Sequence, residues 1–334
     1  MMSQGGSGRH GGNRVKPPDP TLVHKVIDEY ERGQMALTEA LQQLTGRSGN
    51  STATNTPVIE KSRLLSLLTE LDALVGLDEV KRIVREIFAY VYVQQSRVRQ
   101  HLKADPVVLH MVFFGNPGTG KTTVARLLAR LFHECGLLSQ GHLVEVERAD
   151  LVGEYIGHTA QKTREHIKKA LGGVLFIDEA YSLARGGDKD FGREAIDCLV
   201  KGMEDYKNQF IAILAGYERE MEWFLSMNPG LPSRFPIHIH FPDYDADALL
   251  KIAKRALADR QYRMSVDAEI TLRRRIQEVL REVRQEPFSN ARWVRNVVED
   301  AVRRQAVRLF EHRDPKRDDL MLIEAADFAG GARL

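Results

Sequence analysis

The sequence predicts an α/β fold, a doubly wound parallel sheet with helices on both faces, followed by a small all-helical domain. Three observations support this prediction. Short apolar runs bounded by glycine or polar residues alternate with helix-like stretches between about residues 59 and 243, as expected for parallel strands buried on both faces. The first run stops at a glycine-rich turn. After residue 244 the strand-like runs cease and amphipathic stretches continue.

The N-terminal part has a different composition. Residues 1–20 are rich in glycine, serine, proline and basic residues, and we expect a disordered tail there. Residues 21–45 carry apolar residues at helical spacing, interrupted at Gly33, which predicts a helical segment. That segment either docks a partner or covers an apolar patch. Residues 46–58, rich in Ser, Thr, Asn and Gly, predict a linker.

Residues 59–243 contain the runs from which we predict the strands of the α/β domain. They are VVLHMVFFG (107–115), HLVEVE, GGVLFIDEA, QFIAILAGY and PIHIHF. The first run is followed by TTVARLLARLFHECG, a helix that ends at Gly136. In residues 244–325 the pattern predicts helices instead, over the stretches DADALLKIAKRALADR, DAEITLRRRIQEVLREV and NARWVRNVVEDAVRRQAVRLF.

Composition excludes several classes of protein. The 334 residues include 48 basic and 46 acidic side chains, a net charge of +2, which is too balanced for a protein that mainly coats nucleic acid or an anionic membrane. No apolar run reaches the roughly 18–20 residues of a membrane span. The N-terminus lacks the apolar centre of a signal peptide, and the only cysteines are Cys135 and Cys198. We therefore expect a soluble, cytoplasmic protein.

The stretch GNPGTGKT, Gly115 to Thr122, predicts a triphosphate site, because a strand precedes it and a helix follows. Glycines let the backbone turn its N–H groups toward phosphate oxygens, and the helix N-terminus adds a positive dipole end. Lys121 is expected to reach the β- and γ-phosphates, and Thr122 to offer its hydroxyl to Mg²⁺. The remaining expected nucleotide contacts are Asn116, Pro117, Gly118, Thr119, Gly120 and Thr123.

A second half of the site follows the run VLFIDEA. Its buried strand ends at Asp178 and Glu179, and the carboxyl ends of parallel strands face the ligand. We expect Asp178 to help hold Mg²⁺ and Glu179 to orient and deprotonate a water that attacks the γ-phosphate of ATP. An acidic pair alone is common on surfaces; its place behind a buried strand makes it informative.

These residues carry a family resemblance. GNPGTGKT, EYIG, VLFIDEA, an Arg in LPSRF and NARWVRN occur in the order usual for AAA+ ATPases, and the resemblance covers residues 72–310. Within that family the chain is similar to the subgroup of stage V sporulation protein K and the red-type Rubisco activase, and its central run is most similar to the sporulation branch. The resemblance implies ATP hydrolysis.

Further site residues are implied by the resemblance alone. Val75 and Gly76, in LDALVGLDEVKR, match the segment that cups the adenine; the alternative is a plain helix entry. In NARWVRN, Arg292 resembles the arginine through which the helical domain senses the γ-phosphate, with Arg295 as a competing candidate. Many AAA+ proteins also end the fourth strand with a polar sensor, and here Tyr217 is the only polar candidate.

Arg234 in LPSRF resembles the arginine finger that reaches into the neighbouring subunit's site. Charge builds on the γ-phosphoryl oxygens during transfer, and a cation supplied in trans can be worth roughly 10³–10⁵-fold. The resemblance therefore implies that the partners include further copies of the chain, in a ring that is hexameric by family habit.

The stretch Tyr155-Ile156-Gly157 matches the aromatic-hydrophobic-glycine loop that lines the central pore of AAA+ rings. An aromatic side chain can grip an extended polypeptide of any sequence, because apolar contact is non-directional. The alternative is a tyrosine packed under a surface loop. The resemblance implies an unidentified protein substrate and a role in spore development; a Rubisco-activating or a nucleic-acid-remodelling protein are the alternatives.

Overall fold

The structure, a computed structural model, describes residues 61–104, 108–155, 157–185, 191–282, 288–311 and 314–329. All of them belong to one compact unit, Ile59–Leu334. The predicted N-terminal tail, helical segment and linker lie outside the described residues. Within the described part no helix is long and apolar enough to cross a membrane.

A five-stranded sheet forms the centre of the first part of this unit, and every pairing in it is parallel. The strand order is β2-β3-β4-β1-β5. The strands are β1 (Met111–Gly115), β2 (Leu143–Val146), β3 (Val174–Ile177), β4 (Ile211–Gly216) and β5 (Ile237–Phe241). Because β4 lies between β1 and β3, the loops that follow these three strands leave the sheet side by side. The predicted doubly wound sheet is confirmed.

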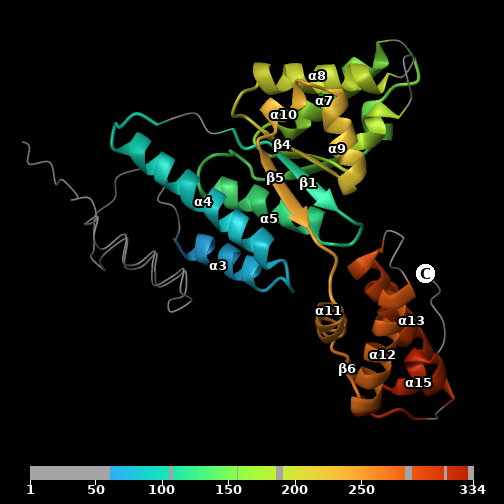
Figure 1. Cartoon of the computed structure of the whole chain (residues 1–334). Helices are drawn as coiled ribbons and strands as arrows, with labels where there is room; N and C mark the ends of the chain where they lie inside the picture. The colour runs from blue at the N-terminus through green and yellow to red at the C-terminus, as the bar shows by residue number, and fades with distance from the viewer. Residues whose placement is uncertain are drawn as a thin grey trace, which may run out of the picture. The chain divides into compact units, whose positions relative to one another are not determined.

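Helices cover both faces of the sheet (Figure 1). Side chains alternate along a strand, so Val112 and Phe114 face one layer and Met111 and Phe113 the other. One layer consists of α7 (His158–Ala170), α8 (Gly192–Asp205) and α9 (Glu218–Met227), with the short α6 (Arg148–Leu151), η1 (Ala180–Ala184) and α10 (Leu231–Arg234) nearby. The other consists of α3 (Lys61–Asp72), α4 (Asp78–Arg99) and α5 (Lys121–Glu134).

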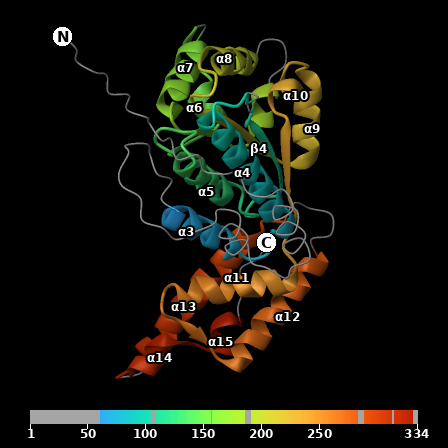
Figure 2. The ribbon, with the colours of Figure 1, turned by 90° about the vertical axis from the view of Figure 1, so that its left-hand side faces the viewer.

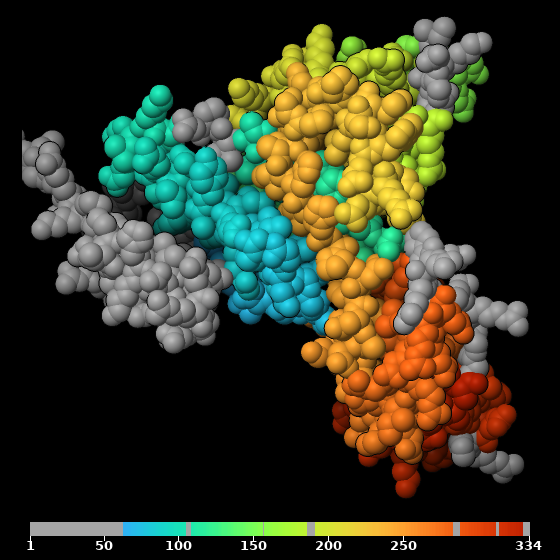
Figure 3. All heavy atoms as spheres, viewed as in Figure 1, coloured from blue at the N-terminus to red at the C-terminus, as the bar shows by residue number. Residues whose placement is uncertain are grey.

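The β1 strand is shorter than the run at 107–115 suggests. It begins at Met111, and residues 108–110 are not in a strand. The physical reason lies at His110, whose Nδ1 accepts the backbone N–H of Ala212 at 3.0 Å. The His110 side chain therefore occupies the Ala212 N–H, which a longer β1–β4 ladder would bond to a backbone oxygen. At the other edge of β1, β5 is covered by α4, whose surface meets that of the β5 region in the space-filling view (Figure 3).

The second part follows β5 and is mainly helical (Figure 2). It contains α11 (Ala246–Ala258), α12 (Val266–Glu282), α13 (Asn290–Phe310), α14 (Arg317–Met321) and α15 (Ala325–Phe328). Its own apolar core includes Leu249, Leu272, Trp293 and Phe328. Sequence reasoning missed one small feature here: two-residue strands β6 (Arg263–Met264) and β7 (Leu322–Ile323) pair in parallel. We call this part the lid.

Candidate nucleotide-binding site

The predicted phosphate loop joins β1 to α5. Gly118 has a φ of 70°, in the left-handed region, and a Cβ added there would lie 2.3 Å from the backbone oxygen of Ser289 and 2.8 Å from the backbone nitrogen of Arg292. Only glycine fits this position, because both the conformation and the contact exclude a side chain. The loop therefore packs directly against the residues that begin α13 in the lid.

The Lys121 ammonium is buried inside this loop. Its Nζ donates to the carbonyl oxygens of Gly115 at 2.8 Å and Asn116 at 2.9 Å. Burial lowers the pKa of Lys121, and the positive charge of Arg292 adds to that, whereas the negative charge of Asp178 opposes it. The lysine is thus held at the mouth of the loop, in electrostatic contact with the acidic end of β3.

The N-terminus of α5 is suited to bind phosphate. Gly120 precedes the helix with a φ of 100°, and no side chain caps the helix. The first backbone N–H groups of a helix have no partner within it, so those of Lys121, Thr122 and Thr123 are available to phosphate oxygens at the positive end of the helix dipole. Thr122 is half-buried and Thr123 exposed. This cradle fits the triphosphate that the sequence predicts.

The acidic pair lies where β3 ends, next to the loop that follows β4. The Asp178 carboxylate accepts the backbone N–H of Glu179 at 3.0 Å. Glu179 is exposed and has a φ of 46°, a left-handed conformation that is uncommon outside glycine. Burial raises the pKa of Tyr181 and of Tyr217, and in both cases the negative charge of Glu179 raises it further.

Tyr217, the predicted sensor, follows β4 and precedes α9. Its ring centroid lies 5.9 Å from that of Tyr181. Burial is the largest cause of its raised pKa, followed by the charges of two glutamates; Arg292 lowers the pKa and Asp178 raises it by smaller amounts. The structure therefore brings Lys121, Asp178, Glu179, Tyr217 and Arg292 to one place, although they come from four different segments.

The predicted adenine segment lies beside the same helix terminus. Gly76 has a φ of 62°, and a Cβ there would meet the Tyr244 ring at 3.5 Å. A Cβ on Gly120 would meet Leu77 at 3.4 Å and the Tyr244 hydroxyl at 3.3 Å. Val75 is half-buried next to this turn. The turn before α4, the start of α5 and Tyr244 therefore form one wall of the site.

The two candidate sensor arginines lie one helical turn apart on α13 and affect different groups. Arg292 acts on the pKa of Lys121 and Tyr217, which belong to the phosphate end of the site. Burial raises the pKa of Tyr244 to about 12, and Arg295 opposes that shift. Arg292 therefore acts on the lysine of the phosphate loop and on the predicted sensor tyrosine, whereas Arg295 acts on the tyrosine whose hydroxyl bonds to Thr119.

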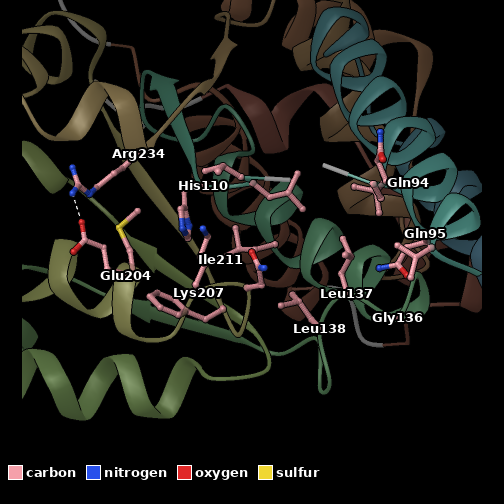
Figure 4. Close-up of a pocket in the computed structure, with 18 of the residues that line it drawn as sticks. Gln94, Gln95, His110, Gly136, Leu137, Leu138, Glu204, Lys207, Ile211 and Arg234 are labelled. Carbon is pink, nitrogen blue, oxygen red and sulfur yellow. Dashed lines mark hydrogen bonds and ion pairs between the residues drawn. The ribbon is translucent and has the colours of Figure 1, made fainter. Parts of the chain in front are cut away.

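Arg234 lies at the opposite edge of the sheet, where the strands begin. Its guanidinium donates to the backbone oxygen of Gly230 at 2.9 Å and contacts the Glu204 carboxylate. Arg234 and Glu204 line a groove of about 870 Å³ that also includes His110 and Lys207, between the start of the strands and α4 (Figure 4). Nothing from the chain's own phosphate loop lines this groove.

The predicted pore loop precedes α7. The Tyr155 side chain is 66% exposed, and its ring lies edge-on to that of His158 with 5.5 Å between centroids. Gly157 has a φ of 84° and begins α7. Ile156 lies outside the described residues. The exposed ring is compatible with the predicted pore loop, which stays a prediction.

Comparisons with known proteins agree with this geometry. The ATPase family associated with various cellular activities (AAA) matches residues 111–243, and the AAA lid domain matches residues 245–333. Stage V sporulation protein K of Bacillus subtilis (strain 168) is 58% identical over 260 residues, which cover 78% of this chain and 81% of that protein. The chain belongs to the AAA family of ATPases. Its ATP-hydrolysing activity and its α/β module with a lid follow from this membership.

This AAA ATPase is also similar to a second curated relative and to a solved structure. The chloroplastic ribulose bisphosphate carboxylase/oxygenase activase of Cyanidioschyzon merolae (strain NIES-3377 / 10D) is 44% identical over 272 residues, covering 80% of this chain and 92% of that protein. The structure of the FIGL-1 AAA domain in complex with ADP superposes with a TM-score of 0.53 at 19% identity, covering 83% of this chain and 90% of that one. The latter supports the fold.

Sequence reasoning missed several polar residues that bond to the phosphate loop or to the predicted arginine finger. Asp243 and Tyr244, in the segment between β5 and α11, bond to the phosphate loop, and Asn290 at the start of α13 bonds to both. Glu204 pairs with the predicted arginine finger. The only available signal was the polar PDY sequence at the point where the pattern changes, since the partners are far apart in the chain.

Proposed function

We propose that this ATPase works as a ring of identical subunits, in which each ATP site is completed by Arg234 of a neighbouring copy. The supporting observation is the position of Arg234 at the amino edge of the sheet, while the phosphate loop follows the carboxyl end of β1. Met111 pairs with Ile237 and Gly115 with Phe241, so the two sites are separated by the length of these strands. At 3.3 Å per residue this is about 13 Å, before the three further residues to Arg234.

The chain's own residues then have distinct tasks in hydrolysis. Lys121 and the N-terminus of α5 hold the phosphates, and Glu179 orients the attacking water and takes its proton. The Thr122 hydroxyl and the Asp178 carboxylate are oxygen donors of the kind that Mg²⁺ prefers, so these two residues would hold the ion, which would neutralise phosphate charge. Arg234 from the neighbour stabilises the charge that develops on the γ-phosphoryl oxygens.

The proposed work is done on a protein partner. Tyr155 is exposed at the start of α7, and α7 runs back to β3, the strand that ends at Asp178 and Glu179. Movement at the nucleotide is therefore connected through one helix and one strand to an aromatic side chain that can grip an extended polypeptide. By family habit the ring has six subunits. The 58% identity to stage V sporulation protein K favours a role in spore development.

Mixing two inactive variants tests the trans role. Arg234→Ala is expected to lower ATP turnover by about 10³-fold or more, and Glu179→Gln is expected to bind ATP without cleaving it. In a random one-to-one mixture, an Arg234→Ala subunit next to a Glu179→Gln subunit has an intact base and receives an intact arginine. Random head-to-tail assembly creates such a pair at roughly one quarter of the sites.

The expected result is therefore recovery of about a quarter of the wild-type turnover per subunit. The matched control is a mixture of Arg234→Ala with a double variant that lacks both Glu179 and Arg234, which has no intact arginine and must stay inactive. A mixture of the two single variants that is as inactive as its components would refute the trans role. So would full wild-type turnover by a chain that sediments as a monomer.

A further inference from the structure

A polar cluster joins the phosphate loop to the lid, and its centre is the carboxylate of Asp243. This residue lies in the short segment between β5 and α11. The Asn116 Nδ2 donates to both of its oxygens, at 3.0 and 2.9 Å, and the Asn290 Nδ2 donates to Oδ1 at 2.7 Å. One carboxylate therefore links the phosphate loop, the connecting segment and the first residue of α13.

Asn290 is the most constrained member of the cluster. Its exposed fraction is 0%, and its φ of 48° is left-handed, which asparagine tolerates better than other residues with a side chain. Its Oδ1 accepts the backbone N–H of Tyr244 at 2.9 Å, while its Nδ2 also donates to the Phe288 oxygen at 2.9 Å. Each end of the amide thus has a defined partner, as a buried polar group requires.

Two further hydrogen bonds to backbone oxygens of the phosphate loop strengthen the same junction. The Tyr244 hydroxyl donates to the Thr119 oxygen at 3.0 Å, and the Ala291 N–H donates to the Gly118 oxygen at 3.2 Å. The phosphate loop is therefore bonded to the lid through two side chains and through its own backbone. A shift of the phosphate loop on nucleotide binding would therefore either break these hydrogen bonds or move the start of α13 with it.

We propose that Asp243 and Asn290 are positioning residues, which transmit the state of the phosphate loop to Arg292 and so set how well this arginine meets the γ-phosphate. Arg292 is the third residue of α13, in the same first turn as Asn290. The inference rests on the predicted role of Arg292 as the arginine that senses the γ-phosphate. Positioning matters at this scale, because a misplacement of 1 Å can cost about a hundred-fold in rate.

The arrangement argues for a transmitting role over simple attachment. Arg292 is exposed, whereas Asn290 beside it is fully buried, so the cluster fixes the base of the helical turn and leaves the guanidinium free to meet a ligand. Asp243 also acts electrostatically on Lys121. The same carboxylate therefore faces the lysine of the phosphate loop and holds the turn that carries the arginine.

The test uses the full-length chain and three variants. Asn290→Gly removes the amide yet keeps the left-handed backbone free of strain, since glycine adopts positive φ readily. Asp243→Asn keeps the shape of the side chain and removes its charge, and it serves if Asn290→Gly does not fold. The matched control, Asp245→Asn, removes a carboxylate two residues further on, whose oxygen accepts the Ala248 N–H at 2.7 Å; an asparagine retains that cap.

Three quantities are measured for each variant: turnover at saturating Mg-ATP, affinity for a non-hydrolysable ATP analogue, and affinity for ADP. We expect Asn290→Gly and Asp243→Asn each to lower turnover by at least about five-fold, the lower end of typical coupling between sites. The affinity for the analogue should fall by more than that for ADP, because only the analogue carries the γ-phosphate that Arg292 meets. Asp245→Asn should resemble the wild type in all three.

A double-mutant cycle with Arg292→Ala decides whether the cluster acts through that arginine. In the Arg292→Ala background we expect Asn290→Gly to cause no further loss of affinity for the analogue. Equal losses for analogue and ADP, or effects that add in the cycle, would overturn the proposal, as would an Arg292→Ala variant that binds both nucleotides normally. None of these outcomes bears on the recovery by mixing, so the two proposals fail separately.

Discussion

The His110 side chain makes the stability of the α/β part sensitive to mild acid. Burial lowers the pKa of His110 from 6.5 to about 4. Its ring lies between Phe210 and Phe235, with centroids 6.0 and 5.8 Å away, and its Nδ1 accepts the Ala212 N–H. If Nδ1 were protonated, its N–H would face the Ala212 N–H and the hydrogen bond would be lost. The folded chain therefore favours the neutral ring.

The sign and size of the effect follow from linkage. Between pH 6.5 and 4 the unfolded chain binds a proton at His110 that the folded chain does not, so stability is complete above pH 6.5 and falls as the pH is lowered toward 4. A shift of this size corresponds to about 3 kcal/mol at its limit, at 1.36 kcal/mol per pKa unit. Between pH 7 and pH 5 the loss should be about 2 kcal/mol.

Urea unfolding measures this loss. Trp223 lies in the α/β part, so a Trp293→Phe background, which removes the lid tryptophan, confines the fluorescence signal to the relevant part. His110→Asn supplies an oxygen for the Ala212 N–H, whereas His110→Phe leaves that donor unpaired, at a cost of about 1–3 kcal/mol at every pH. In both variants the difference in the free energy of unfolding between pH 7 and pH 5 should be about 2 kcal/mol smaller than in the wild type.

The pair of variants separates titration from packing. If either retains the full wild-type difference between pH 7 and pH 5, His110 is not the group responsible and the reasoning is wrong.

Three further outcomes are expected. Glu179→Gln should retain ATP affinity while turnover falls by about 10²-fold or more, as phosphate release would show; normal turnover would reassign the base. Glu179→Gln rings with bound ATP are expected to capture the protein partner. Adding Tyr155→Ala, which removes a side chain that is 66% exposed, should leave ATP binding normal and abolish this capture; an ATP-binding defect would indicate a packing role. In the lid, Asp327 is 2% exposed and accepts from Arg308 at 2.9 and 3.1 Å. Asp327→Ala leaves Arg308 paired with Glu324, so it should cost about 1–3 kcal/mol of lid stability, and an unchanged thermal transition would contradict this.

Much of the fold could be predicted because the signals are local. Three strands of the central sheet, β1, β3 and β4, are continuous apolar runs. The residue that ends the run is recognisable in two of them, since Gly115 is the last residue of β1 and Asp178 directly follows β3. Burial of both faces of a parallel sheet requires continuous apolar runs. The helix after β1 was equally predictable, since a glycine-rich turn precedes the stretch TTVARLLARLFHECG.

What could not be predicted depends on pairs of residues that are far apart in the chain. Asn116 and Asp243 are separated by 127 positions, and Asn290 and Pro117 by 173. An asparagine in a turn and an aspartate after a strand each have an ordinary local explanation, so neither suggests the other. The pairing of β6 with β7 was invisible for a related reason: two residues show no alternation.

The direction of the strands explains why the proposed assembly would be built from head-to-tail contacts. In a parallel sheet the loop that follows β1 and the arginine that precedes β5 leave at opposite edges, so one copy cannot bring Arg234 to its own phosphate loop. A second copy can do so only by placing its amino edge against the first copy's carboxyl edge. Such a heterologous contact leaves one free edge at each end of the assembly, so it repeats from copy to copy; it forms a ring where the rotation between copies closes and an open filament where it does not. A two-fold dimer would pair like edges and complete neither site.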